Sequence, residues 1–286
     1  RKCMSKKMSL LLIAGLVFSM ATGTGTAGWL SQNAPIVQVT DSRWDTIAID
    51  VDIDGLQSQE VKTKEGTYTR LVLDRDAYKG EIGSPRLPVI RKMVEVPYGA
   101  EIKLDYSVKS LKTLDVGSYR LIPVQAPVPK LPGALEAAPF DIDRQIYSQD
   151  RFLSEPEVRI VDIDFMRGHR LVVLEIAPVG YNPVQNQIRF ADGFDIRLTM
   201  TGSDRELTQR MDYRYFNRAY DNLLSDKVLN HAAYRSRDYT FPPPAPVGYM
   251  ILNVADFSSA IAPFVDWKTM EGYEGCDGTA EIRHIQ

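Results

Sequence analysis

Short runs of β-branched and aromatic residues, separated by Gly, Pro and Asp, follow one another through residues 36–200. In the run 47–53, apolar residues alternate with Ala48, Asp50 and Asp52, so a strand there can bury one face and leave the other in water. Comparable runs lie at residues 68–73, 93–96, 102–108, 158–165, 171–176, 187–190 and 194–200. Strands at this spacing, with no amphipathic helices between them, predict an all-β fold, either an antiparallel β-sandwich or a barrel.

Alternating aspartates at positions 50, 52 and 54, followed by Gly55, resemble the start of an EF-hand calcium loop. The twelfth position of such a loop would be Val61, where the loop requires a bidentate Glu. Val51 and Ile53 fit the buried face of a strand instead. We therefore expect these aspartates on the outer face of a strand, as we do Asp162 and Asp164, and we predict no metal site in this chain.

The composition restricts the classes of partner. The chain has 286 residues, of which 44% are hydrophobic, enough for a sizeable core. Its formal net charge is −3 and its sequence pI is near 5.7, so no global basic field attracts nucleic acid or anionic lipid. We expect neither partner, and we expect a monomer.

The N-terminal segment predicts export. Arg1, Lys2, Lys6 and Lys7 precede an apolar run at residues 10–18, and small residues follow as far as position 27. This order is that of a secretory signal peptide, and the apolar run is too short for a stable membrane span. We predict a signal peptide at residues 1–27 and a secreted, periplasmic or extracellular protein; Met4 and Met8 both remain candidate starts.

The cysteines predict no disulfide in the exported part. Only Cys3 and Cys276 are present, and Cys3 would leave with the signal peptide. Cys276 has no catalytic context with a histidine around it, so we interpret it as an incidental thiol.

Residues 121–139 interrupt the strand pattern with repeated prolines. Because proline cannot donate to a central β-ladder, we expect an exposed loop or an edge there.

From residue 204 onward, unevenly spaced apolar residues among charges predict short helices or a mobile connector. Two arginines, Arg235 and Arg237, then precede the polyproline run 241–246, which is typical of a linker between domains and of a proteolytic site.

The last segment predicts the start of an α/β unit. An apolar run at residues 249–254 reads as a buried strand, and Asp256 as the cap of a following helix that Gly272 stops. Residues 276–286 show no clear strand pattern, so a parallel sheet cannot be completed from this sequence. We expect the residues after about 249 to be loosely packed on the sandwich or disordered.

Three groups of motifs carry a resemblance to gingipain-type cysteine peptidases. Those resembling the first half of the family's pro-domain are Gly83-Ser-Pro-Arg-Leu-Pro88 and Val96-Pro-Tyr-Gly-Ala100. Those resembling its second half are Arg167-Gly168, Ala177-Pro-Val-Gly-Tyr-Asn-Pro183 and Phe190. Those resembling the opening of the catalytic domain are Tyr249-Met-Ile-Leu252, Pro263-Phe-Val-Asp-Trp-Lys268 and Gly272-Tyr273. The order and separation of these motifs make the resemblance specific.

The resemblance implies a domain plan. It comprises a signal peptide (1–27), a β-sandwich pro-domain (28–203), a connector with the activation linker (204–248) and a truncated start of a caspase-like α/β catalytic domain (249–286). Such a pro-domain assists folding and export and blocks the cognate catalytic domain, which is its partner, until it is cut away.

The resemblance also bears on catalysis and cofactors. The family's catalytic His/Cys pair lies well downstream of its first helix, so we expect no enzyme activity and no catalytic residues in this chain. We also expect that Cys276 and His284 do not form a working catalytic dyad. A frameshift or a premature end after Tyr273 would explain the tail. We expect no cofactor in this chain, although calcium is common in the family's intact catalytic domain.

Two sets of site residues follow from the resemblance. Lys130, in Pro127-Val-Pro-Lys-Leu-Pro132, lies near the place of the family's inhibitory loop, where a basic residue enters the specificity pocket like a substrate. Proline-flanked presentation would stiffen that loop; the alternative is an ordinary solvated lysine.

Arg237, with Arg235 as neighbour and alternative, lies where the family's activation cut occurs. The alternative for the whole chain is a stand-alone extracellular β-sandwich module for binding or adhesion.

Overall fold

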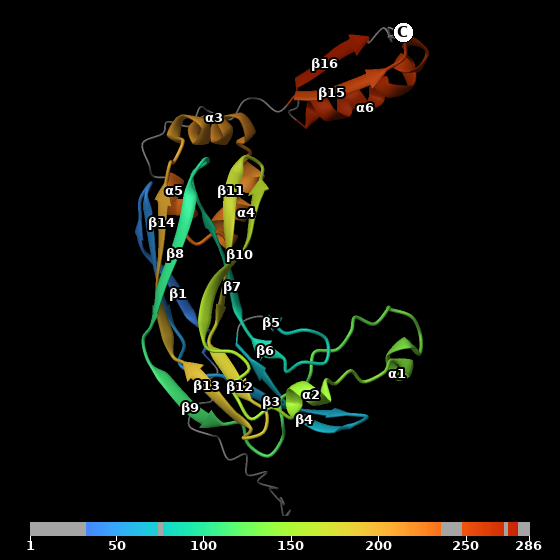
Figure 1. Ribbon diagram of the computed structural model, residues 1–286. Helices are drawn as coiled ribbons and strands as arrows, with labels where there is room; N and C mark the ends of the chain where they lie inside the picture. Colours follow the sequence, from blue (N-terminus) through green and yellow to red (C-terminus); the bar gives the residue numbers. More distant parts are fainter. Residues whose placement is uncertain (1–32, 74–76, 236–247, 272–273, 280–286) are drawn as a thin grey trace, which may run out of the picture.

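The computed structural model describes residues 33–73, 77–235, 248–271 and 274–279. Two antiparallel sheets run side by side along the molecule (Figure 1) and confirm the predicted antiparallel β-sandwich. The first sheet, in spatial order, consists of β1 (Ile36–Ser42), β2 (Thr46–Asp52), β14 (Gly193–Thr201) and β8 (Glu101–Val108). The second consists of β10 (Glu157–Met166), β11 (His169–Ala177) and β7 (Ile90–Glu95).

The core lies between these sheets because alternate side chains of each strand point inward. Ile49 of β2 pairs with Ile196 of β14, and both are buried together with Val94 of β7 and Leu174 of β11 in one hydrophobic cluster. Full burial of such a side chain contributes about 1.5–3 kcal/mol relative to its exposure to water. The period-two pattern of the sequence is therefore the pattern that stabilises the sandwich.

A third sheet and two hairpins complete the β structure at one end of the sandwich. The third sheet, in spatial order, consists of β12 (Val179–Asn182), β13 (Gln187–Ala191) and β9 (Leu111–Asp115). The paired strands of the hairpins are β3 (Gln57–Thr63) with β4 (Gly66–Val72), and β5 (Tyr78–Lys79) with β6 (Leu87–Pro88). Two short helices, α1 (Ala134–Ala137) and α2 (Arg144–Tyr147), lie in the long connection between β9 and β10.

The region predicted as a helical or mobile connector forms three helices at the other end of the sandwich (Figure 1). These are α3 (Arg205–Tyr215), α4 (Arg218–Lys227) and α5 (His231–Arg235). Side-chain oxygens of Asp204 and Asn217 accept hydrogen bonds from the first turns of α3 and α4, which explains where these helices begin.

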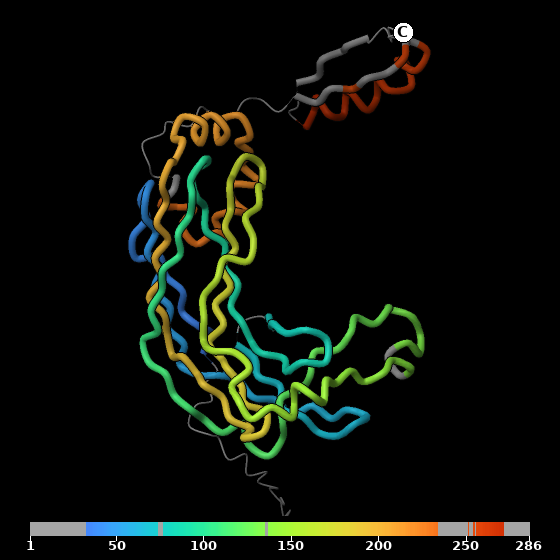
Figure 2. The backbone as a smooth tube through the Cα atoms, viewed as in Figure 1, coloured from blue at the N-terminus to red at the C-terminus, as the bar shows by residue number. Residues whose placement is uncertain are grey.

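The segment between α4 and α5 adds to the free edge of β7. Val228 forms a parallel bridge with Met93, and the amide of Leu229 donates to the carbonyl oxygen of Met93 at 2.9 Å. Figure 2 shows this stretch of chain beside the sheet although it follows β7 by more than a hundred residues. The connector is thus packed on the sandwich up to α5.

A tight turn joins β10 to β11 and sets the start of β11. Arg167 and Gly168 both have positive φ, 48° and 84°, as expected for a two-residue hairpin turn. A Cβ on Gly168 would lie 2.9 Å from the carbonyl oxygen of Met211 in α3. Only glycine therefore allows this turn and the close approach of α3 together.

The C-terminal segment forms a β-α-β unit from β15 (Gly248–Asn253), α6 (Ser258–Met270) and β16 (Glu274–Thr279). The expectation that residues 276–279 form no strand was wrong, because β16 pairs in parallel with β15 and its backbone ladder outweighs the weak strand propensity of its glycines. Asp256 is not the helix cap either; it lies in the 3-10 turn η1 (Ala255–Phe257), and the N-cap is Phe257. Among the described residues, no helix has the length and apolar composition to cross a bilayer.

Candidate functional site

The proline-rich loop that contains Lys130 is closed at its base by side-chain hydrogen bonds of Gln125 and Asp141 to the backbone of the opposite arm. The side-chain amide of Gln125 donates to the carbonyl oxygen of Asp141 at 2.8 Å and accepts from the Asp141 amide at 3.0 Å. The Asp141 carboxylate in turn accepts from the amide of Ala126 at 3.1 Å. Residues 126–140 therefore leave the body of the sandwich and return to it as one closed loop (Figure 2).

Lys130 lies at the apex of a tight turn within this loop. The amide of Leu131 donates to the carbonyl oxygen of Pro129 at 2.8 Å, which closes a three-residue turn centred on Lys130. Lys130 is exposed, and so is Leu131 beside it, with 68% of its surface in contact with solvent. The loop can thus present a cation and an apolar side chain to a partner surface.

The exposed-loop prediction for residues 121–139 is correct only from about position 125 onward. Leu121 and Val124 are buried, and Val124 forms a β-bridge with Ile82. The apolar side chains at the start of this segment are buried in the protein. The many prolines of the segment gave no indication of this burial.

The remaining candidate residues lie partly outside the described part of the chain. Arg235 is the last residue of α5, and nothing is described of its side chain; Arg237 and His284 lie outside the described residues, as does the predicted signal peptide at 1–27. Cys276 belongs to β16.

The strand interpretation of the aspartates at 50 and 52 is confirmed. Val51 is buried between them, and both carboxylates form ion pairs with Lys109, that of Asp52 at 2.7 Å. Asp54 accepts a hydrogen bond from Asn33 at 3.0 Å. Asp50 and Asp52 therefore lie on the outer face of β2 and bind a lysine, whereas Asp54 lies beyond the end of that strand and binds Asn33.

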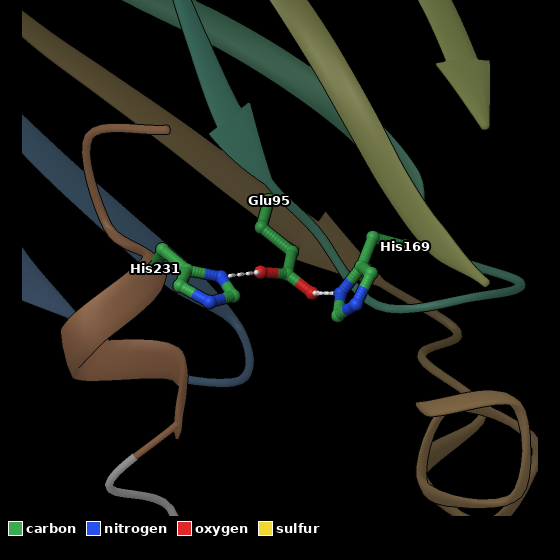
Figure 3. Close-up of side chains that lie close together, drawn as sticks. All are labelled: Glu95, His169 and His231. Atoms are coloured by element: carbon green, nitrogen blue, oxygen red, sulfur yellow. Dashed lines mark hydrogen bonds and ion pairs between the residues drawn. The ribbon is translucent and has the colours of Figure 1, made fainter. Parts of the chain in front are cut away.

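A buried cluster of Glu95, His169 and His231 lies where the connector meets the sandwich, and the sequence did not suggest it (Figure 3). Glu95 ends β7, His169 begins β11 directly after the tight turn, and His231 begins α5. The two carboxylate oxygens of Glu95 lie between the rings, 2.5 Å from Nδ1 of His169 and 3.0 Å from Nδ1 of His231. Nε2 of His231 lies 2.9 Å from the carboxylate of Asp221 in α4.

Burial and hydrogen bonding act in opposite directions on these groups. Burial raises the pKa of Glu95, but hydrogen bonds and charge from the two histidines outweigh it and hold the pKa below its usual value. Burial lowers the pKa of His231, while the carboxylates of Glu95 and Asp221 on its two nitrogens raise it overall. Both nitrogens of His231 face carboxylates, and because an ionised carboxylate only accepts hydrogen bonds, this arrangement favours the doubly protonated ring.

Sequence reasoning missed this cluster because it considered the histidines only as catalytic bases. Glu95 is separated from His169 by 74 residues and from His231 by 136 residues. No spacing rule links residues so far apart. The one available signal was that His169 directly follows the Arg167-Gly168 motif and that His231 lies in the predicted connector.

Comparisons with known proteins agree with the fold. The family model Propeptide_C25 matches residues 30–223, more than half of the chain. Lys-gingipain HG66 of Porphyromonas gingivalis is 26% identical over 284 residues, covering 94% of this chain and 16% of that protein. Gingipain R2 of Porphyromonas gingivalis is 22% identical over 262 residues, covering 91% of this chain and 34% of that protein. The chain thus spans at most about a third of the length of these two relatives.

Two solved structures share the fold. One concerns the zymogenic latency of gingipain K from Porphyromonas gingivalis; it has a TM-score of 0.55 and 25% identity, and the match covers 61% of this chain and 97% of that chain. The other is the complex of Porphyromonas gingivalis RgpB pro- and mature domains, with a TM-score of 0.54, 19% identity, and coverage of 69% and 97%. The chain therefore belongs to the Propeptide_C25 family, and its matched region is the non-catalytic pro-region of a gingipain-like cysteine peptidase.

Proposed function

We propose that this pro-region inhibits its cognate gingipain-like catalytic domain by inserting Lys130 into the specificity pocket of that enzyme. The exposed apex of the loop, held at its base by Gln125 and Asp141, is the observation that carries this proposal. A loop held rigidly before binding loses less conformational entropy on docking than a free chain. The relatives with solved structures concern zymogenic latency and a complex of pro- and mature domains, which supports a catalytic domain as the partner.

The proposal includes the processing of the chain. Export by the signal peptide at residues 1–27 would bring the zymogen into the extracytoplasmic space as a monomer, with residues 28–203 as pro-domain and 249–286 as the start of a caspase-like domain. Cleavage after Arg237, or after Arg235, within the connector 204–248 would then separate the inhibitor from the enzyme. During export the sandwich would also assist folding of the catalytic domain.

The decisive experiment measures inhibition by the full chain of a panel of Lys-specific and Arg-specific gingipain-type catalytic domains. An anchor residue of this kind contributes about 2 kcal/mol or more to binding. Lys130→Ala is therefore expected to raise the inhibition constant by about 30-fold or more, since 1.4 kcal/mol corresponds to about tenfold. Lys130→Arg should shift preference toward Arg-specific enzymes.

Lys103→Ala is the matched control, because the Lys103 side chain is 74% exposed on β8, away from the loop. It should leave the inhibition constant unchanged. Equal effects of Lys130→Ala and Lys103→Ala would refute Lys130 as the anchor. A complete lack of inhibition across the panel would favour the alternative, a stand-alone extracellular binding or adhesion module.

A further inference from the structure

Three ligand-bearing side chains from separate elements converge at the buried junction of connector and sandwich. Glu95, His169 and His231 each offer one ligand atom, and these three atoms lie within 4.8 Å of one another. They come from β7, β11 and α5, so the junction exists only when α5 is docked (Figure 3). All three residues are buried, so this cluster differs from the groups of exposed acidic side chains that are common on protein surfaces.

The ligand types select a class of metal ion. Two imidazole nitrogens with one carboxylate oxygen suit Zn²⁺ and related divalent transition metals, whereas Ca²⁺ and Mg²⁺ prefer oxygen ligands alone. A fourth donor lies nearby, since a carboxylate oxygen of Asp212 in α3 is 3.7 Å from Nδ1 of His169. Zn²⁺ sites with three or four such ligands are tetrahedral.

The outer shell has the arrangement that supports a metal-bound histidine. Asp221 holds Nε2 of His231 at 2.9 Å, which leaves Nδ1 of that ring directed at Glu95 and the centre of the cluster. A carboxylate on the far nitrogen of a ligating histidine fixes its tautomer and orientation. Asn230 further fixes Glu95, because its side chain bonds both the amide and the carbonyl oxygen of that residue.

We propose that Glu95, His169 and His231, with Asp212 as fourth ligand, bind a divalent transition-metal ion of the Zn²⁺ type. On binding, the ion takes the place of the protons shared between the Glu95 carboxylate and the two Nδ1 atoms, and these protons pass to solvent. The ion bridges α3 and α5 to β7 and β11, so its binding free energy stabilises the docked connector. This inference does not depend on inhibition by Lys130, which lies in a separate loop.

The test titrates the metal-stripped full chain with Zn²⁺ by calorimetry and with Co²⁺ by visible absorption. We expect one ion per chain, the ligand-field bands of tetrahedral Co²⁺, and a thermal midpoint that rises with the Zn²⁺ concentration. His169→Gln and His231→Gln should each abolish the cobalt bands. Asp221→Asn, at a partly exposed position, should weaken Zn²⁺ binding about 10–100-fold through loss of the outer-shell carboxylate.

Cys276→Ser and His284→Ala are the controls, since they remove the thiol outside the predicted signal peptide and the third histidine of the sequence; both should bind Zn²⁺ as the parent does. Circular dichroism establishes whether each variant is folded, and Asp221→Asn keeps the test decisive if a histidine variant unfolds. The proposal is overturned if the parent neither binds Zn²⁺ nor gains thermal stability from it. It is equally overturned if binding survives in Asp221→Asn and the histidine variants, or is lost in Cys276→Ser.

Discussion

Replacing Asn230 with alanine tests whether the segment between α4 and α5 is an integral part of the sandwich. Asn230 is only 1% exposed. Its Oδ1 accepts from the amide of Glu95 at 2.7 Å, and its Nδ2 donates to the carbonyl oxygen of Glu95 at 2.8 Å. One side chain therefore satisfies both backbone polar groups at the end of β7.

The expected magnitude follows from the two bonds. Removing the Asn230 amide leaves one buried donor and one buried acceptor of Glu95 without these partners, and each such loss costs about 1–3 kcal/mol. Asn230→Ala should therefore lower the free energy of unfolding by about 2–6 kcal/mol. Asn230→Asp should not rescue this loss, because its second carboxylate oxygen would face the carbonyl oxygen of Glu95 at a buried site.

Urea unfolding of the full chain, followed by circular dichroism, measures this loss. Hydrogen exchange at the amides of Glu95 and Leu229 localises it. Asn222→Ala is the matched control, since Asn222 is exposed in α4, and it should change stability by no more than about 0.5 kcal/mol. A loss below about 1 kcal/mol in Asn230→Ala, with unchanged exchange at both amides, would refute the view that this clamp holds the connector on the sheet.

Two further predictions concern the sandwich itself. Burial raises the pKa of Glu175, but its ion pairs with Arg159 and Arg91, at 2.6 and 2.7 Å, lower it below the ordinary value of 4.5. Because the folded-state pKa lies below the unfolded one, the stabilisation by ionised Glu175 is complete above about pH 4.5 and is lost as the pH falls further. Glu175→Gln should therefore flatten the acid limb of a curve of stability against pH. An unchanged acid limb would contradict this role of Glu175. Gly180→Ala would place a Cβ against the carbonyl oxygen of Ser154, closer than van der Waals contact allows, so a loss of about 1–3 kcal/mol or more is expected in urea unfolding. Wild-type stability would show that the contact relaxes freely.

Strands with a strong alternation could be predicted from sequence, and polar ones could not. The run 47–53 corresponds to β2 (Thr46–Asp52), whose inner side chains are buried. The strand β3 (Gln57–Thr63) has a polar sequence and no buried side chain, so it carries no period-two signal. Its pairing with β4 (Gly66–Val72) holds it in place, and such pairing depends on a partner that local sequence does not identify.

The Lys130 loop could be located in advance because prolines and glycines report directly on the local backbone. Sequence could not show that Gln125 and Asp141 close its base, since this pairing depends on how the chain returns to the sandwich. The cluster of Glu95, His169 and His231 could not be predicted from sequence for the same reason.

The sequence by itself determined the strand-rich antiparallel fold and the position of the exposed loop, because alternation and prolines act on neighbouring residues. The family relationship also depended only on the order of local motifs. The tertiary structure alone decided that the segment after α4 would join the edge of β7 and that a carboxylate would meet two histidines there. Such contacts form between residues far apart in the chain, and the packing of whole elements, not any local preference, brings them together.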